Sequence, residues 1–551
     1  MTGPALASTM MDGALMLDAF VERAALLFPN VEVVSRRADK SLERHGYREI
    51  GHRVRSLATG LARAGLREGD RVATLMWNHH FHLEAYFGVP MAGGVYHTLN
   101  LRLGVEDIAY IVRHARDRFL LVDDVLLPLL AKVPGILAKD GGPIERVFVA
   151  DVAGIKEIGG FESLDELIGG GDAGFVRLPA DERRAAGLCY TSGTTGKPKG
   201  VLYSHRSLVL HTLGTGLADA FGICQRDTVL PVVPMFHANA WGLAFTTTMC
   251  GAKLVLPGPM LDPESLLDLY EKERVTFSAG VPTIWLGILH ALEREPKRWS
   301  LVPDLRMVVG GAAAPESLIR GLDAFGLRVI HAWGMTETSP MGTIATVKAS
   351  LSEASEDDRY RLRAKQGMPV PFVEIRAVSE TGEVPWDGKS LGELEVRGPW
   401  VAASYFENEE ATDRWTADGW FRTGDVVHID AEGYVVIADR TKDLIKSGGE
   451  WISSVALENA LMGHPTVKEA AVVAIPDEKW GERPAAAVVW KGEVKATKAE
   501  LLAHLAPHFA KWALPDVFVA IDAVPKNSTG KFLKSALRDL LADPTKRDPL
   551  A

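Results

Sequence analysis

Cysteine is scarce in this chain, and long hydrophobic runs are missing. The 551 residues include three cysteines, Cys189, Cys224 and Cys250, which form neither a disulfide framework nor the paired spacing of a metal site. No stretch of 18 apolar residues occurs, so we expect no membrane-spanning helix. The first twenty residues lack the basic segment of a secretory signal peptide. These absences favour a cytoplasmic protein in a reducing compartment.

Excess positive charge is also missing. Lysine and arginine number 61 against 71 acidic residues, which gives a net charge of −10. That balance argues against a nucleic-acid partner or an anionic membrane partner. A polyanionic substrate would need a local cluster of positive charge. The length exceeds what one hydrophobic core serves and predicts several folding units.

Amphipathic helices alternate with apolar strands along most of the chain. Residues 50–66 place Ile50, Val54 and Leu57 on one helical face, and residues 70–76 form an apolar run typical of a buried strand. We expect a further short strand from residue 47 and a glycine-rich loop over residues 154–174. The alternation predicts an α/β fold with largely parallel sheets, followed by a compact α+β unit of about one hundred residues.

One stretch concentrates groups that suit a phosphate. Residues 191–200 contain three glycines, three threonines, one serine and two lysines, directly after the apolar run 185–190. Glycines let backbone N–H groups turn inward, and hydroxyls and lysines add donors and charge, as a triphosphate requires. The spacing is not that of a P-loop, because two residues separate Gly193 from Gly196 and a proline follows Lys197. Composition alone also fits an ordinary surface loop.

The stretch resembles the phosphate-binding signature of the adenylate-forming superfamily, which includes acyl-CoA synthetases, luciferases and adenylation domains. Companion motifs follow in the expected order: residues 331–337 end in Trp-Gly-Met-Thr-Glu, residues 423–425 are Thr-Gly-Asp, and residues 524–534 contain Gly-Lys. The resemblance runs from about residue 17 to residue 541. The block at residues 446–454 is typical of bacterial medium- and long-chain fatty acyl-CoA synthetases, and it also fits methylmercaptopropionate-CoA ligases.

This resemblance implies a domain organisation. An N-terminal adenylation domain made of α/β subdomains, residues 1–438, would bind the acid and ATP. Residues 439–443 would be a hinge, and residues 444–551 a small mobile α+β domain. Composition alone describes residues 439–452 as a solvated, charged linker. Members of this branch can also dimerise through the N-terminal domain, so a homodimer is part of the expectation.

The implied activity is that of an ATP-dependent carboxylic acid–CoA ligase that uses Mg²⁺. An acyl-adenylate forms with release of pyrophosphate, and the CoA thiol then displaces AMP. A medium- or long-chain fatty acid is the expected substrate. Alternatives are a short thioether acid such as 3-methylmercaptopropionate or an aryl acid, or, in another class, a nucleotide- or acyl-CoA-binding protein without catalysis. The presence of Lys531, Glu337 and Asp425 argues against the last.

The resemblance also assigns roles to individual residues. The expected catalytic residues are Lys531, His237, Thr336 and Glu337, with Thr191 and Glu337 near the metal. The residues expected to bind ATP or AMP are Thr191, Ser192, Gly193, Thr194, Thr195, Gly196, Lys197, Gly311, Ala312, His331, Ala332, Trp333, Gly334, Thr336, Asp425, Arg440 and Lys442. Lys446 and Trp451 would serve the second half-reaction with CoA.

Two of these residues have plain structural interpretations as well. Trp241 resembles the tryptophan that covers the fatty-acid tunnel of bacterial long-chain acyl-CoA synthetases, and core packing explains it equally well. His237, taken alone, would be a buried histidine with its hydrogen bonds satisfied. Its neighbours in the Met-Phe-His step favour a place near the acyl carboxylate.

Overall fold

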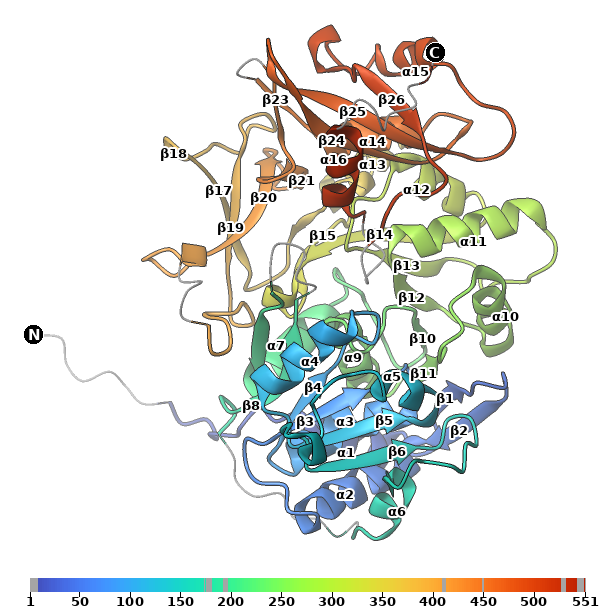
Figure 1. The fold of residues 1–551 in the computed structure, drawn as a ribbon, viewed down its shortest axis with the longest axis vertical. Coiled ribbons are helices and arrows are strands. Elements are labelled where there is room, and N and C mark those ends of the chain that lie inside the picture. Colours follow the sequence, from blue (N-terminus) through green and yellow to red (C-terminus); the bar gives the residue numbers. More distant parts are fainter. Residues whose placement is uncertain are drawn as a thin grey trace, which may run out of the picture.

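The computed structural model describes residues 8–172, 174, 181–191, 197–408, 413–447, 450–526, 532–542 and 550. Two large sheets and an antiparallel five-stranded sheet make up the N-terminal part. The last hundred residues, orange to red in Figure 1, form a separate layered unit in its upper part. The observed fold is therefore α/β with a large N-terminal and a small C-terminal domain, which is the fold class that the sequence predicts.

The first sheet has seven strands and carries the phosphate stretch at one edge. Its strands, in spatial order, are β7 (Glu162–Ser163), β6 (Arg146–Ala150), β5 (Phe119–Asp123), β3 (Arg71–Leu75), β4 (Val95–Thr98), β8 (Ala185–Tyr190) and β9 (Gly200–Ser204). All neighbours are parallel except β8 and β9. The antiparallel β8–β9 pair forms because only nine residues separate the two strands, too few for a crossover.

Helices cover both faces of this sheet. They are α1 (Asp18–Leu27), α2 (Tyr47–Arg63), α3 (His80–Met91), α4 (Val105–Ala115), α5 (Leu127–Leu130) and α6 (Leu164–Gly169). The predicted apolar face of α2 is confirmed, since Ile50, Val54 and Leu57 are fully buried. At about 1.5–3 kcal/mol per buried aliphatic side chain, such a face fixes the helix against the sheet.

The second sheet has nine strands with a parallel centre and antiparallel edges. Its order is β16 (Met368–Pro369), β15 (Met341–Ile344), β14 (Leu327–Gly334), β13 (Leu305–Val309), β12 (Phe277–Gly280), β10 (Thr228–Pro231), β11 (Lys253–Leu256), β1 (Glu32–Arg36) and β2 (Leu42–Gly46). The associated helices are α7 (His205–Gly216), α8 (Ala238–Trp241), α9 (Leu243–Cys250), α10 (Pro263–Glu273), α11 (Pro282–Arg294), α12 (Glu316–Asp323) and α13 (Glu356–Ala364). A core that includes Leu266, Trp285 and Ile319 lies under α10, α11 and α12.

The antiparallel sheet packs against the second sheet through one shared core. Its order is β18 (Gly382–Glu383), β17 (Glu374–Ser379), β19 (Gly392–Arg397), β20 (Phe421–Ile429) and β21 (Val435–Arg440). Val308 and Ile330 of the second sheet belong to the same buried cluster as Leu394 and Phe421 of this one. That core fixes β20 and β21 relative to β13 and β14.

The C-terminal unit is a sheet with helices on both faces. Its strands are β22 (Ile445–Ser447), β23 (Glu450–Ile452), β24 (Val467–Asp477), β25 (Gly481–Trp490) and β26 (Val517–Ala520), and its helices are α14 (Ser454–Met462), α15 (Lys498–Leu505) and α16 (Lys534–Ala542). One core includes Leu457 and Leu501, and the opposite one includes Leu537 and Leu541. The α+β unit predicted for this region is therefore observed.

Two local predictions were wrong. Residue 47 begins α2 rather than a strand; its preceding strand is β2, and the Tyr47 hydroxyl donates to Ala252 O at 2.8 Å. The stretch 154–174 is not only a loop, because it contains β7 and α6. The Ser163 hydroxyl accepts the Glu166 N–H and caps α6.

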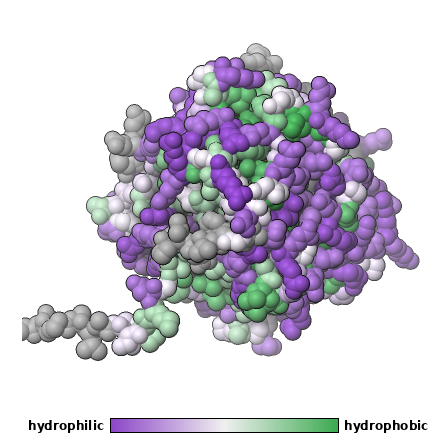
Figure 2. Space-filling model, turned by 90° about the horizontal axis from the view of Figure 1, so that it is seen from below, coloured by the Kyte–Doolittle hydropathy of each residue, from purple (hydrophilic) through white to green (hydrophobic). Residues whose placement is uncertain are grey.

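The surface is mostly polar, as Figure 2 shows for the face seen from below, where small hydrophobic patches are scattered among hydrophilic side chains. Among the helices of the described residues, none has both the length and the apolarity that a bilayer crossing needs.

Candidate active site

Several predicted site residues lie where the parallel strands of the nine-stranded sheet end. Gly311 and Ala312 follow β13, residues 331–334 close β14, and the segment 232–237 follows β10. Because parallel strands β10, β12, β13 and β14 run side by side, these segments share one edge. Ligands of open α/β sheets bind at such carboxyl-terminal edges.

The nucleoside candidates form one connected group. The indole N–H of Trp333 donates to Asp425 Oδ2 at 2.8 Å, and Arg440 Nε lies 3.3 Å from Asp425 Oδ1. Asp425 on β20 and Arg440 on β21 are direct cross-strand neighbours. Trp333 and Asp425 are both buried, so an aromatic face and a held carboxylate lie side by side.

The glycine turn after β13 has the geometry that close approach requires. Gly311 has a φ of +80°, in the left-handed region that glycine adopts without strain. A Cβ at Gly310 would meet the Ala332 carbonyl oxygen and the Trp241 indole, each at 3.1 Å. Gly334 has no room for a side chain either, since its Cβ would meet Pro340 O at 1.7 Å. The side-chain positions of Gly310 and Gly334 are therefore filled by neighbouring backbone and by the Trp241 indole, and this is the close approach that glycine permits here.

His331 lies behind this edge rather than open to it. Its side chain is buried, and Nδ1 is 3.0 Å from Ala364 O at the end of α13. Burial lowers the pKa of His331 to about 4, so the imidazole is neutral at physiological pH. Its backbone pairs with Val309 of β13, and its carbonyl oxygen accepts the Ala345 N–H at 2.8 Å, so ring and carbonyl both have partners within the protein.

The base of the phosphate loop is closed by two hydrogen bonds. The Thr191 N–H donates to Lys199 O at 2.9 Å, and the Lys199 N–H donates to Thr191 Oγ1 at 3.1 Å. Lys197 Nζ lies 4.9 Å from the ring centroid of Tyr110 on α4, and Lys199 Nζ lies 4.9 Å from that of Tyr405. Both lysines are therefore held beside aromatic faces at the C-terminal end of the loop.

Five residues of this loop, and the expected catalytic lysine, lie outside the described residues. They are Ser192, Gly193, Thr194, Thr195, Gly196 and Lys531.

Tyr405 connects the loop base with the predicted metal residue. Its hydroxyl donates to Glu337 Oε1 at 2.6 Å, and both side chains are buried. Burial raises the pKa of Tyr405, which keeps this group a hydrogen-bond donor. The neighbouring Thr336 accepts the Tyr203 hydroxyl at its carbonyl oxygen, at 2.8 Å. The Thr-Glu step is thus fixed by two tyrosines on separate segments.

The segment that leads to His237 is held by the first sheet. Asn78 accepts the Met235 N–H at 2.7 Å and donates to Pro231 O and Val233 O. The Tyr86 hydroxyl donates to Met235 O. His237 is half-buried, and its N–H donates to Pro234 O at 3.0 Å. The acyl end of the candidate site is therefore fixed to both large sheets.

An unusual turn carries the predicted gate. Residues 238–241 all have left-handed backbones, with φ between 42° and 59°, and Gly242 follows at 77°. Such a conformation costs non-glycine residues about 1–2 kcal/mol each. Asn239 in this turn accepts the Tyr96 hydroxyl at 3.1 Å. The indole of Trp241 is buried against Gly310, between the acyl segment and the glycine turn.

The hinge region links β21 to the C-terminal unit. The Asp439 carboxylate accepts the Ser454 N–H at 2.8 Å, at the start of α14, and Lys442 is exposed in the turn that follows β21. Lys446 and Trp451 lie opposite each other on the β22–β23 hairpin. Lys446 Nζ is 4.4 Å from the Trp451 ring, which is half exposed.

Family models account for most of the chain. Residues 21–406 match the AMP-binding enzyme model, and residues 456–531 match the AMP-binding enzyme C-terminal domain. The chain belongs to the AMP-binding enzyme family.

Individual relatives of this AMP-binding enzyme agree with that assignment. The long-chain-fatty-acid–CoA ligase of Thermus thermophilus is 52% identical over 97% of both chains. The 3-methylmercaptopropionyl-CoA ligase of Ruegeria pomeroyi is 44% identical over 97% of this chain and 98% of its own. The crystal structure of ATP-bound MatB from Rhodopseudomonas palustris matches with a TM-score of 0.79 and 27% identity, over 96% and 99% of the chains. The predicted superfamily and fold class are confirmed.

Tyr405 and Tyr203 are the site residues that sequence reasoning missed. Each acts through one hydroxyl on a distant segment, and neither belongs to a recognisable local pattern. The left-handed turn at residues 238–241 was also missed, because among its four residues only Asn239 is a type that favours this conformation.

Proposed function

We propose that this AMP-binding enzyme joins a medium- or long-chain fatty acid to CoA through an acyl-adenylate. The observation that carries the substrate class is the 52% identity to a long-chain-fatty-acid–CoA ligase over nearly the full length of both chains. The activity class itself, an AMP-forming acid–CoA ligase, is the one that sequence reasoning predicted, and these relatives confirm it.

The geometry supports a division of roles. Trp333 would stack on adenine, and Asp425 would accept from the ribose hydroxyls, with Arg440 beside it. Gly311, Ala312 and residues 332–334 would give the base and α-phosphate access to the backbone. The loop 191–197 would hold the β- and γ-phosphates through N–H groups, hydroxyls and Lys197.

In the first step the acid's carboxylate oxygen attacks the α-phosphorus and the bond to pyrophosphate breaks. Two anions meet, so positioned positive charge is the main requirement. Lys531 would supply it, and His237 and Thr336 would flank the reacting groups. In the second step the CoA thiol attacks the acyl carbonyl, its proton is lost, and AMP leaves.

The donor set beside the loop fits Mg²⁺. Glu337 offers a carboxylate that a buried tyrosine holds in place, and Thr191 offers a hydroxyl at the loop base. Magnesium prefers such oxygen ligands and usually shares them with substrate phosphates. When bound, it would neutralise charge on the leaving pyrophosphate.

The two steps need different partners at one place, so we propose that residues 444–551 rotate about residues 439–443. Lys442 would be the pivot, and Lys446 and Trp451 would face CoA after the rotation. What supports this is the turn at residues 441–443, which connects β21 with the first strand of the small unit; Asp439, at the end of β21, accepts the Ser454 N–H at the start of α14. The division into residues 1–438, hinge and 444–551 belongs to this proposal; a homodimer and a cytoplasmic location stay predictions.

A panel of acids tests the substrate class. Pyrophosphate release is measured with acids of increasing chain length, with and without CoA, for the wild type and Lys531→Ala. We expect release with C8–C18 acids and a loss of about a hundredfold or more in the variant, the effect of removing one aligned cation. Release with short acids only would favour a thioether or aryl acid, and the Ruegeria relative makes 3-methylmercaptopropionate the first of these to include. No release with any acid would contradict catalysis.

A further inference from the structure

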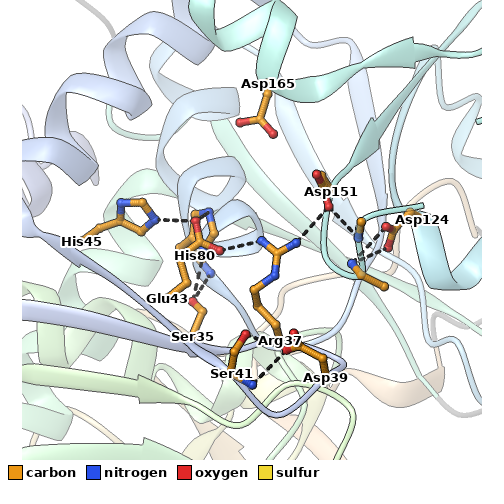
Figure 3. A network of polar contacts seen from close by, with 12 residues as sticks. Ser35, Arg37, Asp39, Ser41, Glu43, His45, His80, Asp124, Asp151 and Asp165 are labelled. Carbon is orange, nitrogen blue, oxygen red and sulfur yellow. Dashed lines mark hydrogen bonds and ion pairs between the residues drawn. The ribbon is translucent and has the colours of Figure 1, made fainter. Parts of the chain in front are cut away.

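A second group of polar side chains lies outside the candidate active site, between the edge strand β2 and the start of α3 (Figure 3). Glu43 and His45 are two residues apart on β2, so their side chains project from the same face of the strand. His80 is the first residue of α3. Two histidines and a carboxylate from separate elements therefore converge on one point.

The spacing of these groups suits a metal ion. Glu43 Oε1 lies 3.0 Å from His45 Nε2 and 3.8 Å from His80 Nε2, and the ligand atoms of all three residues lie within 4.8 Å of one another. Ligands 2.0–2.1 Å from a tetrahedral Zn²⁺ are about 3.3 Å apart. The separations of 3.0 and 3.8 Å from Glu43 Oε1 bracket that value, so an ion between these atoms requires only small side-chain shifts.

The outward-facing nitrogen of His80 has a hydrogen-bond partner, and that of His45 has a carboxylate neighbour. His80 Nδ1 is 3.2 Å from Ser35 Oγ, which also accepts the His80 N–H at 2.9 Å. His45 Nδ1 is 2.9 Å from Glu49 Oε1, although the angle is poor for a hydrogen bond. Ligating histidines typically use the second nitrogen in this way, which fixes the ring and the tautomer. His45 Nε2 shares a hydrogen bond with Glu43 Oε1 at 3.0 Å, and His80 Nε2 faces the same oxygen at 3.8 Å.

His80 Nε2 is the atom that needs explaining. The side chain is 2% exposed, and Nε2 has no hydrogen-bond partner among the described residues. Nε2 faces the Glu43 carboxylate across 3.8 Å, which is too far for a hydrogen bond, and an unpaired buried polar atom is costly. A cation between the two atoms satisfies both.

Among the described residues, the hydrogen-bond partner of Glu43 Oε1 is His45 Nε2, and a bound ion would replace that hydrogen bond. Arg37 Nη1 binds the other oxygen, Oε2, at 3.0 Å, and Arg37 Nη2 binds Asp151 Oδ1 at 2.9 Å. The guanidinium is thus shared between two carboxylates and does not occupy the space between Glu43 and the histidines (Figure 3). A cavity of about 10 Å³, close to the lower limit for one water-sized particle, lies beside the group and is lined by Glu43 and His80 together with Arg37 and Asp151, but not by His45.

We propose that Glu43 Oε1, His45 Nε2 and His80 Nε2 bind one Zn²⁺. Two imidazole nitrogens and one carboxylate oxygen are a zinc donor set, whereas Mg²⁺ and Ca²⁺ prefer oxygen alone. The ion ties β2 to α3. Its ligand His80 is two residues from Asn78 in the chain, and the Asn78 side chain holds the backbone at Met235. The role of the ion is therefore to stabilise the acyl end of the active site rather than to take part in the reaction.

Zinc titration of the full chain tests the site. The protein is stripped of metal by chelation, and binding of ZnSO₄ is followed by calorimetry in the absence of ATP and with excess Mg²⁺. Co²⁺ replacement then gives the absorption of a tetrahedral or five-coordinate site. We expect one tight equivalent per chain, weakened at least tenfold in Glu43→Gln and in His45→Gln.

The matched control is His52→Gln. His52 is exposed on α2 and lies outside the cluster, so this variant should keep the tight equivalent. Circular dichroism of each metal-free variant checks that it is folded. The proposal is overturned if the folded wild type binds no equivalent below 100 µM zinc, or if both cluster variants bind zinc as tightly as His52→Gln does.

Discussion

The contact between Tyr405 and Glu337 gives the sharpest test of the proposed metal position. Tyr405 donates to Glu337 Oε1 at 2.6 Å, and its ring lies beside Lys199. The variant Tyr405→Phe removes one oxygen atom and keeps the ring. The contact with Lys199 therefore remains, while the buried carboxylate loses the donor that fixes its direction.

The expected magnitude follows from the type of bond. A hydrogen bond to a charged group contributes about 1.5–3 kcal/mol. At one factor of ten per ~1.4 kcal/mol, its loss lowers kcat/KM for adenylation by about 10- to 150-fold if the bond acts in the transition state. Because Glu337 is proposed to hold Mg²⁺, the variant should also need a higher Mg²⁺ concentration for its half-maximal rate.

The assay is single-turnover formation of acyl-adenylate over a range of Mg²⁺ concentrations. Tyr360→Phe is the matched control, since the Tyr360 hydroxyl also donates to a carboxylate, Asp323 Oδ2 at 3.0 Å, on helices distant from the loop. We expect the control to behave as the wild type does. If Tyr405→Phe adenylates at the wild-type rate with unchanged Mg²⁺ dependence, Glu337 does not orient the metal.

Three further predictions concern the core, the gate and the hinge. Burial lowers the pKa of His211 to about 3, so below pH ~6.5 the unfolded chain binds a proton at this residue and the folded protein does not. The free energy of unfolding should therefore fall by up to ~1.4 kcal/mol per pH unit as the pH drops from 6.5 toward 3. Urea midpoints between pH 7 and 5 should show a shallower loss in His211→Gln, and an identical slope would contradict this. Gly310→Ala should displace the Trp241 indole and so tighten acid binding several-fold in the absence of ATP, as measured by tryptophan fluorescence. Gly169→Ala is the control, because a Cβ there meets open space, and it should not change acid binding. Equal acid affinity in the two variants would refute the proposed gate. Lys442→Pro should impair thioester formation from preformed acyl-adenylate more than adenylation, and two intact half-reactions would rule out the hinge.

Periodicity predicted the elements whose stability comes from a repeated apolar face. Helix α2 was found because Ile50, Val54 and Leu57 recur at helical spacing and are buried. Its first turn was missed because Tyr47, a residue favoured in strands, is placed in the helix by a distant contact with Ala252 O. Tertiary contacts of this kind leave no local pattern.

The candidate site shows the same difference between residues found from local patterns and residues placed by distant contacts. Trp333, Glu337 and Asp425 were located through motifs, since each motif keeps its chemistry in one short stretch. The partners that fix them, such as Tyr405 68 residues from Glu337, come from other segments. Sequence therefore supplied the hypothesis of which groups face the substrates, and the structure shows how those groups are held.

We propose that the turn at residues 238–241 moves when the enzyme acts. On one side of Trp241, Asn78 and Tyr86 bind the backbone at Met235, so the acyl segment is firmly held. On the other side, Gly310 is part of the turn that ends a central strand. Between them, residues 238–241 carry a left-handed conformation that costs about 1–2 kcal/mol per residue. Rotation of this turn toward ordinary backbone angles would release that energy and withdraw Trp241 from Gly310. If a nucleotide bound beside Gly310 displaces the indole, as we propose, relief of the turn would offset part of the packing energy that is lost.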